Sequence, residues 1–205
     1  MSSLLLRGFA LGFAIAATPG PIFFLCLRRT LLRGRLYGFV SGLGVATADG
    51  LYAAIAAFGF VVVISAVASG RRPFALAGGA VLIGLGLRIL FERRDRPAEV
   101  AASSGAGLVW AYLSTLGLTI TNPATVISFA ALAATLSLGG GGGQARPAAL
   151  VGGVLLGSAA WWLGLAIGAS LLRARLTPAV IGAINTFSGL AIVVLGMMAV
   201  YSAFS

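Results

Sequence analysis

The sequence contains no histidine and no lysine, a single cysteine and only four acidic residues among 205. Without histidine there is no Ser/His/Asp set, and with so few acids there is neither a metal-ligand cluster nor a pair of buried carboxylates. The lone Cys26 permits no intrachain disulfide and no paired-thiol chemistry. A phosphate-binding loop is also absent. We therefore expect a protein that is not an enzyme and that uses no metal and no cofactor.

Apolar residues are what the chain has in quantity: 60% of it is hydrophobic, and its mean hydropathy is +1.07. That composition is typical of an integral membrane protein. The net charge of +10 comes from arginines that cluster between apolar runs. This pattern indicates membrane topology and argues against a nucleic-acid partner. The first run is long enough to span, so we expect a membrane segment rather than a cleaved signal peptide.

Six apolar runs approach or exceed the ~20 residues of a membrane helix, which predicts an all-α protein with six transmembrane helices. The runs are Leu4–Leu27, Leu36–Val67, Phe74–Phe91, Leu108–Leu138, Ala148–Leu172 and Ala179–Ala203. The first, third and fifth gaps carry ten arginines, against four in the N-terminal segment and the other two gaps. Because positive loops stay in the cytoplasm, both termini of this multi-pass chain are expected on the extracytoplasmic side of the inner membrane.

Two of these runs contain a proline break. Thr18, Pro19, Gly20 and Pro21 interrupt the first run, and Thr121, Asn122 and Pro123 interrupt the fourth. Proline removes a backbone donor and clashes with the preceding turn, so we expect helices 1 and 4 to be broken there. In hydrocarbon the freed backbone groups must be buried in protein or line a cavity. Each element is either a kinked helix satisfied by its neighbours or a discontinuous helix that binds solute or ion. The first run either crosses the membrane or forms a re-entrant segment.

A weak internal repeat marks two halves of the chain. Gly79 and Gly86 in the third run match Gly189 and Gly196 in the sixth, each pair seven residues apart. The matching glycine pairs and the two proline breaks predict two three-helix repeats, 1–99 and 107–205. Residues 100–106 link the repeats within one membrane domain. Because three is odd, the second repeat has inverted topology. Locally, small residues seven apart lie on one helix face and predict close packing.

Three further residues are candidates for the solute path. Asp49 is the only acid inside an apolar run, and burying its charge there costs about 2.5–3.5 kcal/mol. Either it is protonated and bonded to a neighbouring helix, or it binds a substrate ammonium, a coupling proton or Na⁺. Trp162 is an interfacial anchor or part of a gate or substrate wall. Asn185 makes an interhelical bond or contacts the ligand.

The order of these elements carries a family resemblance. Thr18-Pro19-Gly20-Pro21, Asp49, the stretch from Gly78-Gly79 to Leu85-Gly86-Leu87-Arg88, and Thr121-Asn122-Pro123 follow one another along nearly the whole chain. In this the sequence resembles the LysE/RhtB-type amino-acid exporter family. It departs at Ile22 and Ala124, where many members have Asn and Lys. The resemblance implies a small inner-membrane exporter of amino acids or related solutes, driven by an ion gradient and often dimeric.

The sequence thus predicts a secondary-active exporter of an amino acid or similar small metabolite, coupled to protons or Na⁺ and working by alternating access. Half-helix ends at the two breaks would present backbone dipoles to a substrate carboxylate, and Asp49 would take the ammonium group or the coupling proton. The expected partners are this solute, the ion, the lipid bilayer and a second copy in a homodimer. A solute-conducting channel and a non-transporting regulatory membrane module are the alternatives.

Overall fold

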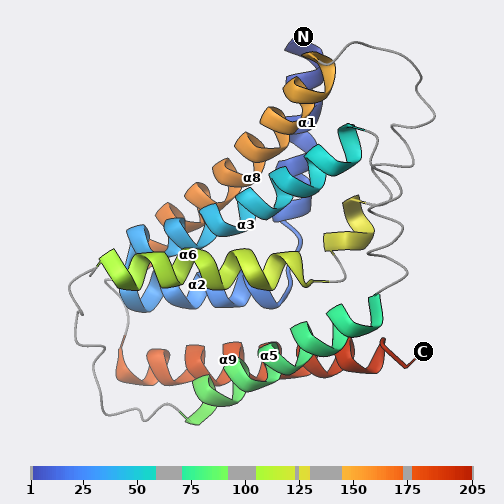
Figure 1. The fold of residues 1–205 in the computed structure, drawn as a ribbon. Coiled ribbons are helices and arrows are strands. Elements are labelled where there is room, and N and C mark those ends of the chain that lie inside the picture. Colours follow the sequence, from blue (N-terminus) through green and yellow to red (C-terminus); the bar gives the residue numbers. More distant parts are fainter. Residues whose placement is uncertain are drawn as a thin grey trace.

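The computed structural model describes residues 2–58, 71–91, 105–122, 125–129, 145–172 and 177–204 (Figure 1). These residues form helices and turns and contain no strand, which confirms the predicted all-α fold for this part of the chain. In order, the helices are α1 (Ser2–Ala16), α2 (Pro21–Arg33), α3 (Arg35–Ala57), α5 (Arg71–Phe91), α6 (Gly105–Ile120), α8 (Ala145–Leu172) and α9 (Pro178–Tyr201). A short helical stretch covers 125–129. Of the expected linker, residues 100–104 lie outside the described part, and α6 already begins at Gly105.

The first apolar run is broken where the sequence predicts. α1 ends at Ala16, α2 begins at Pro21, and the chain bends by 83° between them. Pro21 is the first residue of α2, a position that suits proline because the N–H groups there have no helical partner. Gly20 precedes it in an extended conformation. The two prolines and the glycine therefore end one helix and start another.

The fourth run is broken as well. α6 ends at Ile120 and helix resumes at Thr125, while Pro123 lies outside the described residues. Side chains satisfy carbonyl groups at the end of α6. The Tyr52 hydroxyl donates to the Ile120 carbonyl at 2.6 Å, and Thr121 Oγ1 donates to the Gly117 carbonyl at 3.0 Å. The cost of interrupting the helix in an apolar environment is thereby reduced.

Helix length gives fewer membrane spans than the six that the apolar runs of the sequence predict. Among the described residues, α3, α8 and α9 are long and apolar enough to cross a membrane, and the bent pair α1 and α2 forms either a fourth, broken span or a re-entrant loop. The other two apolar helices cover Ala75–Phe91 and Gly105–Ile120, which is shorter than the ~20 residues of a span. α6 is short because the second break ends it. Six spans therefore remain a prediction.

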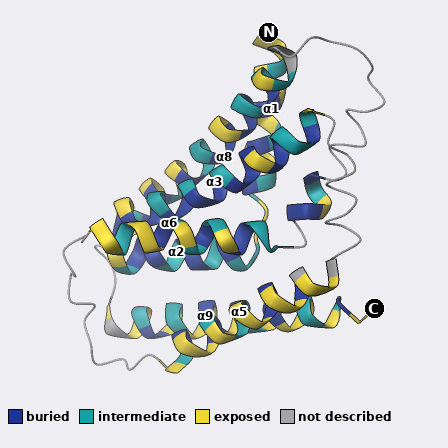
Figure 2. Cartoon of the chain, in the orientation of Figure 1, coloured by how far each residue is buried: buried dark blue, intermediate teal, exposed yellow. Residues whose placement is uncertain are grey.

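The helices pack in two layers. α3 lies in the middle of the first layer between α8 and α6, and α1 runs along α8 (Figure 1). α5 and α9 pack on each other in the second layer, and α9 reaches α2. Figure 2 shows buried residues along α3 and exposed residues along the outer faces of α5 and α9. Exposed side chains such as Trp110, Leu156 and Met198 are apolar, as a lipid-facing surface requires.

Glycines let α5 and α9 approach each other at backbone distance. A Cβ added to Gly79 would lie 2.8 Å from the Gly196 carbonyl oxygen, and one added to Gly86 would lie 2.8 Å from that of Gly189. The close packing predicted for these four glycines is confirmed, and the two pairs pack on one another. Glycine-lined contacts also join α1 to α8.

The arginines of the first predicted gap lie on helices rather than in a loop. α2 continues to Arg33 and α3 begins at Arg35, so Gly34 alone separates them. Gly34 has a φ of 96°, a left-handed conformation that glycine adopts at little cost. Arg29 of α2 lies inside the protein, where it donates hydrogen bonds to Ser41 Oγ and to the Ala111 carbonyl.

Candidate functional site

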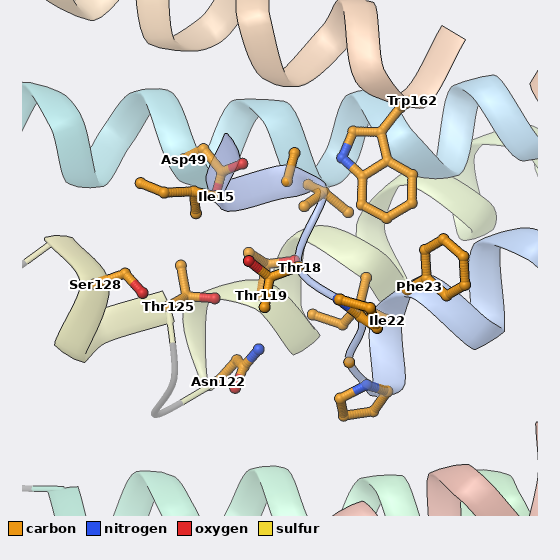
Figure 3. A pocket seen from close by; sticks show the side chains of 15 residues that line it. Ile15, Thr18, Ile22, Phe23, Asp49, Thr119, Asn122, Thr125, Ser128 and Trp162 are labelled. Carbon is orange, nitrogen blue, oxygen red and sulfur yellow. The ribbon is translucent and has the colours of Figure 1, made fainter. Parts of the chain in front are cut away.

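A cavity of about 120 Å³ lies where the two helix breaks face α3 and α8. Its wall includes the first break, from Thr18 to Pro21, and Asn122 of the second break. Asp49 of α3 and Trp162 of α8 also line the cavity (Figure 3). Residues of both predicted breaks therefore lie around one cavity.

Asp49 is held in this wall by one hydroxyl group. Its side chain is 2% exposed, and its Oδ2 accepts a hydrogen bond of 2.7 Å from Ser158 Oγ on α8. Asp49 is the only acidic residue in the described part of the chain, and no salt bridge reaches it there. Ser158 was not among the residues singled out from the sequence. A lone serine in an apolar run gives no signal until α8 is known to pack on α3.

The polar lining beside the second break follows a regular spacing. Thr119, Asn122, Thr125 and Ser128 all line the cavity, each three residues after the previous one (Figure 3). Thr119, Thr125 and Ser128 were missed from the sequence, although this spacing was visible in it. Thr121 does not line the cavity, and its hydroxyl donates to the Gly117 and Leu118 carbonyls of its own helix. Hydroxyl and amide side chains of this segment therefore lie along one side of the cavity, where the Thr119 hydroxyl donates to the Thr115 carbonyl of its own helix at 2.7 Å.

Trp162 and its neighbour Trp161 have different surroundings. Trp162 is 3% exposed, and its Cβ and Cγ pack so closely on Gly42 that a Cβ there would clash with them. Trp161 instead makes an edge-to-face contact with Phe13 at 5.3 Å and does not line the cavity. The indole nitrogens of both are buried and have no hydrogen-bond partner among the residues that the structure describes. Only that of Trp162 belongs to a side chain in the cavity wall.

Asn185 and Arg29 lie outside the cavity. Asn185, a candidate from the sequence, accepts a hydrogen bond of 2.9 Å from Arg28 Nε, which ties α9 to α2. Arg29 is 9% exposed and donates to Ser41 Oγ at 3.1 Å and to the Ala111 carbonyl at 3.0 Å. It therefore joins α2, α3 and α6 between the cavity and the arginine-rich helix ends. Sequence reasoning placed Arg29 in the gap between the first two apolar runs and so overlooked this role.

Comparison with known proteins identifies a family and a relative. Residues 13–203 match the model of the family described as LysE type translocator. The chain is also similar to the chemotactic transduction protein ChpE of Pseudomonas aeruginosa, with 28% identity over 165 residues that cover 78% of this chain and 79% of the relative. No solved structure matches the chain.

Proposed function

This chain belongs to the LysE type translocator family, and we propose that it is a secondary-active exporter of an amino acid or similar small metabolite across the inner membrane. The observation that carries the proposal is the cavity at the two helix breaks, with a buried carboxylate in its wall. Ionisable groups inside membrane proteins are costly and mark solute or ion pathways. A translocator moves its solute chemically unchanged, so the site needs binding groups and no catalytic ones.

The cavity offers complementary groups to a zwitterion. Asp49 binds the substrate ammonium or, in the coupling step, a proton or Na⁺. α2 begins at Pro21 in the cavity wall, and the free N–H groups and positive dipole end of a helix N-terminus favour a carboxylate. Ile22, where many family members have Asn, makes this wall more apolar. The solute is therefore held by opposite charges at opposite ends, with hydroxyl groups of the second break along one side.

We further propose that six transmembrane helices form two inverted three-helix repeats, 1–99 and 107–205, linked by 100–106. In such a repeat α1 would correspond to α6, α3 to α8 and α5 to α9. The contacts between helices support this correspondence, because exchanging the members of each pair reproduces them. The exchange turns the α1–α8 contact into the α6–α3 contact and maps α3–α8 and α5–α9 onto themselves. The glycine pairs that pack across α5 and α9 are exchanged in the same way. Rocking of one repeat against the other would then expose the cavity alternately to each side.

The direction of the helices supports a cytoplasmic location for the arginine-rich gaps. The ends of α2, α5 and α8 and the beginnings of α3, α6 and α9 gather toward the left of Figure 1. These ends adjoin the three gaps that hold ten arginines. By the positive-inside rule this edge faces the cytoplasm, and both termini are extracytoplasmic.

A second candidate is a non-transporting membrane module that regulates a partner. The name of the relative ChpE, a chemotactic transduction protein, favours it. A solute-conducting channel is the third reading of the same cavity. The channel and the exporter differ in whether an ion gradient drives net flux, and the regulatory module gives no flux at all.

Counterflow in proteoliposomes tests the proposal. Purified protein is reconstituted and loaded with unlabelled amino acids, one at a time, and uptake of the labelled form is measured with and without gradients of protons or Na⁺. We expect counterflow with at least one small amino acid and net accumulation only with a gradient. Flux without counterflow, which merely equilibrates the solute and is not driven by either gradient, would support the channel, and no flux with any member of the panel would support the regulatory module.

A further inference from the structure

The wall of the cavity has an apolar end. Ile22 of α2, Val45 of α3 and Trp162 of α8 line the cavity and belong to one buried hydrophobic cluster, against which Phe23 packs. In Figure 3, Trp162, Phe23 and Ile22 lie together at one end, and the indole nitrogen is on the ring edge turned away from the other two. Because that nitrogen is itself buried, Trp162 presents carbon atoms to the cavity. This end of the wall therefore suits an apolar group.

The polar side of the wall favours a hydrogen-bond donor on the solute. The Thr119 hydroxyl donates to the Thr115 carbonyl at 2.7 Å, and the Thr18 hydroxyl donates to the Ala14 carbonyl at 3.3 Å. Since each of these hydroxyl groups has already given its proton to its own helix, what it presents to the cavity is an accepting oxygen. Asp49 adds a carboxylate to the same wall. Accepting oxygens suit the N–H groups of an ammonium, which leaves the apolar end for a different part of the solute.

We propose that the apolar end is a side-chain subsite and that the transported solute is a small aliphatic α-amino acid of about the size of valine. The inference rests on the proposed export function and names the substrate class of that same cavity. With the ammonium at Asp49 and the carboxylate at the N-terminus of α2, the side chain is the remaining substituent of the α-carbon. Ile22, Val45 and Trp162 contact that side chain and are the specificity-determining residues.

The spacing along α3 fits such a solute. Gly42, Val45 and Asp49 lie on one face of α3, and Trp162 packs on Gly42. The levels of Gly42 and Asp49 are about 10 Å apart along the helix axis. A hydrogen bond of ~2.8 Å between ammonium and carboxylate, the few ångströms from the nitrogen to the end of a short branched side chain, and a carbon–carbon contact of ~3.8 Å bridge a similar length. Val45 then lies beside the side chain of the solute.

The size of the cavity limits the length of that side chain. Its volume is about 120 Å³, somewhat less than the ~150 Å³ of an engineered cavity that binds benzene. A solute of about six to eight non-hydrogen atoms fits this space. Valine and 2-aminobutyrate are within this limit, and aromatic amino acids exceed it.

Isosteric substrates test the subsite on the wild-type protein. L-Valine and L-threonine have the same shape and differ by a methyl group against a hydroxyl, as do L-2-aminobutyrate and L-serine. In an apolar subsite the hydroxyl loses its hydration and gains no partner. We expect the KM for counterflow to be roughly 10- to 100-fold lower for the aliphatic member of each pair. Because this comparison needs no substitution, it remains decisive when a variant fails to fold.

Val45→Thr makes the same exchange of methyl for hydroxyl in the protein. A threonine in a helix can donate to the carbonyl four residues earlier, here that of Ser41, so the helix should tolerate the change. We expect the preference for valine over threonine to fall about 5- to 20-fold, because the subsite loses a methyl contact and gains an accepting oxygen. The matched control is Val154→Thr on α8. Val154 is 0% exposed, belongs to another hydrophobic cluster and does not line the cavity, so the preference should stay at its wild-type value.

Several results would overturn the subsite and leave the export function standing, because a solute still moves in each. They are wild-type counterflow of threonine with a KM equal to or below that of valine, and counterflow of a polar or charged amino acid when neither valine nor 2-aminobutyrate is moved. An unchanged preference in folded Val45→Thr, or an equal change in Val154→Thr, would also contradict the inference. Absence of counterflow with every amino acid tested would instead refute the proposed function, and the subsite with it.

Discussion

Replacing Asp49 by asparagine should separate transport from stability. The substitution removes the negative charge and keeps the shape of the side chain. The amide oxygen can still accept the hydrogen bond that Ser158 Oγ donates to Asp49 Oδ2 at 2.7 Å. The packing of α3 on α8 should therefore survive the change, and the missing charge is the main difference felt by a solute.

The substitution should affect stability and transport in opposite directions. An ionised aspartate in the membrane interior costs about 2.5–3.5 kcal/mol, and asparagine avoids this cost, so the thermal stability should be equal or higher. Losing one member of a buried ion pair costs about 3–5 kcal/mol. If Asp49 binds the substrate ammonium, transport at limiting substrate should fall by roughly 10²- to 10³-fold.

Initial rates of counterflow and a thermal scan of the purified protein measure the two effects together. Ser158→Ala is the matched control, because it removes the hydroxyl and leaves the carboxylate in place. We expect it to reduce transport by only about tenfold, the effect of one hydrogen bond. Transport by Asp49→Asn at the wild-type rate and with the wild-type pH dependence would refute the assignment. So would a loss of activity that follows a loss of folded protein.

Three further predictions address the scaffold. Gly79→Ala places a Cβ within 2.6 Å of Val200 Cγ2 and should destabilise the protein by about 1–3 kcal/mol in a thermal scan. Gly84→Ala on the same helix, with nothing within 4 Å, should be neutral or stabilising, and equal effects would contradict the packing of α5 on α9. Arg29→Gln, which loses the bonds to Ser41 and the Ala111 carbonyl, should lower the stability by about 1–3 kcal/mol, and an unchanged melting temperature would show that this link between helices is dispensable. In a Cys26→Ala background, Ser205→Cys should react with a membrane-impermeant maleimide added to intact cells, because the arginine distribution predicts an extracytoplasmic C-terminus. Labelling that occurs only after cell lysis would show that the C-terminus faces the cytoplasm and would contradict the predicted topology.

The sequence by itself determined the features whose causes are local. Long apolar runs specify membrane helices through their hydrophobicity, and Pro19 and Pro21 break the first run wherever its neighbours lie, because proline lacks the N–H and fixes its own φ. The heptad spacing of Gly79 and Gly86 likewise predicts a small-residue helix face. The family resemblance, carried by these same residues, agrees with the matched LysE type translocator model.

Tertiary packing decided what each polar side chain faces. Asp49 and Ser158 are 109 residues apart, and only the contact of α3 with α8 brings them to 2.7 Å. Trp161 and Trp162 are adjacent and chemically identical, yet one packs on Phe13 and the other lines the cavity, because consecutive residues on a helix point about 100° apart. Arg29 is buried because α3 and α6 pack against α2 at this position. Which direction is lipid, which is protein and which is cavity depends on neighbouring helices that no local pattern encodes.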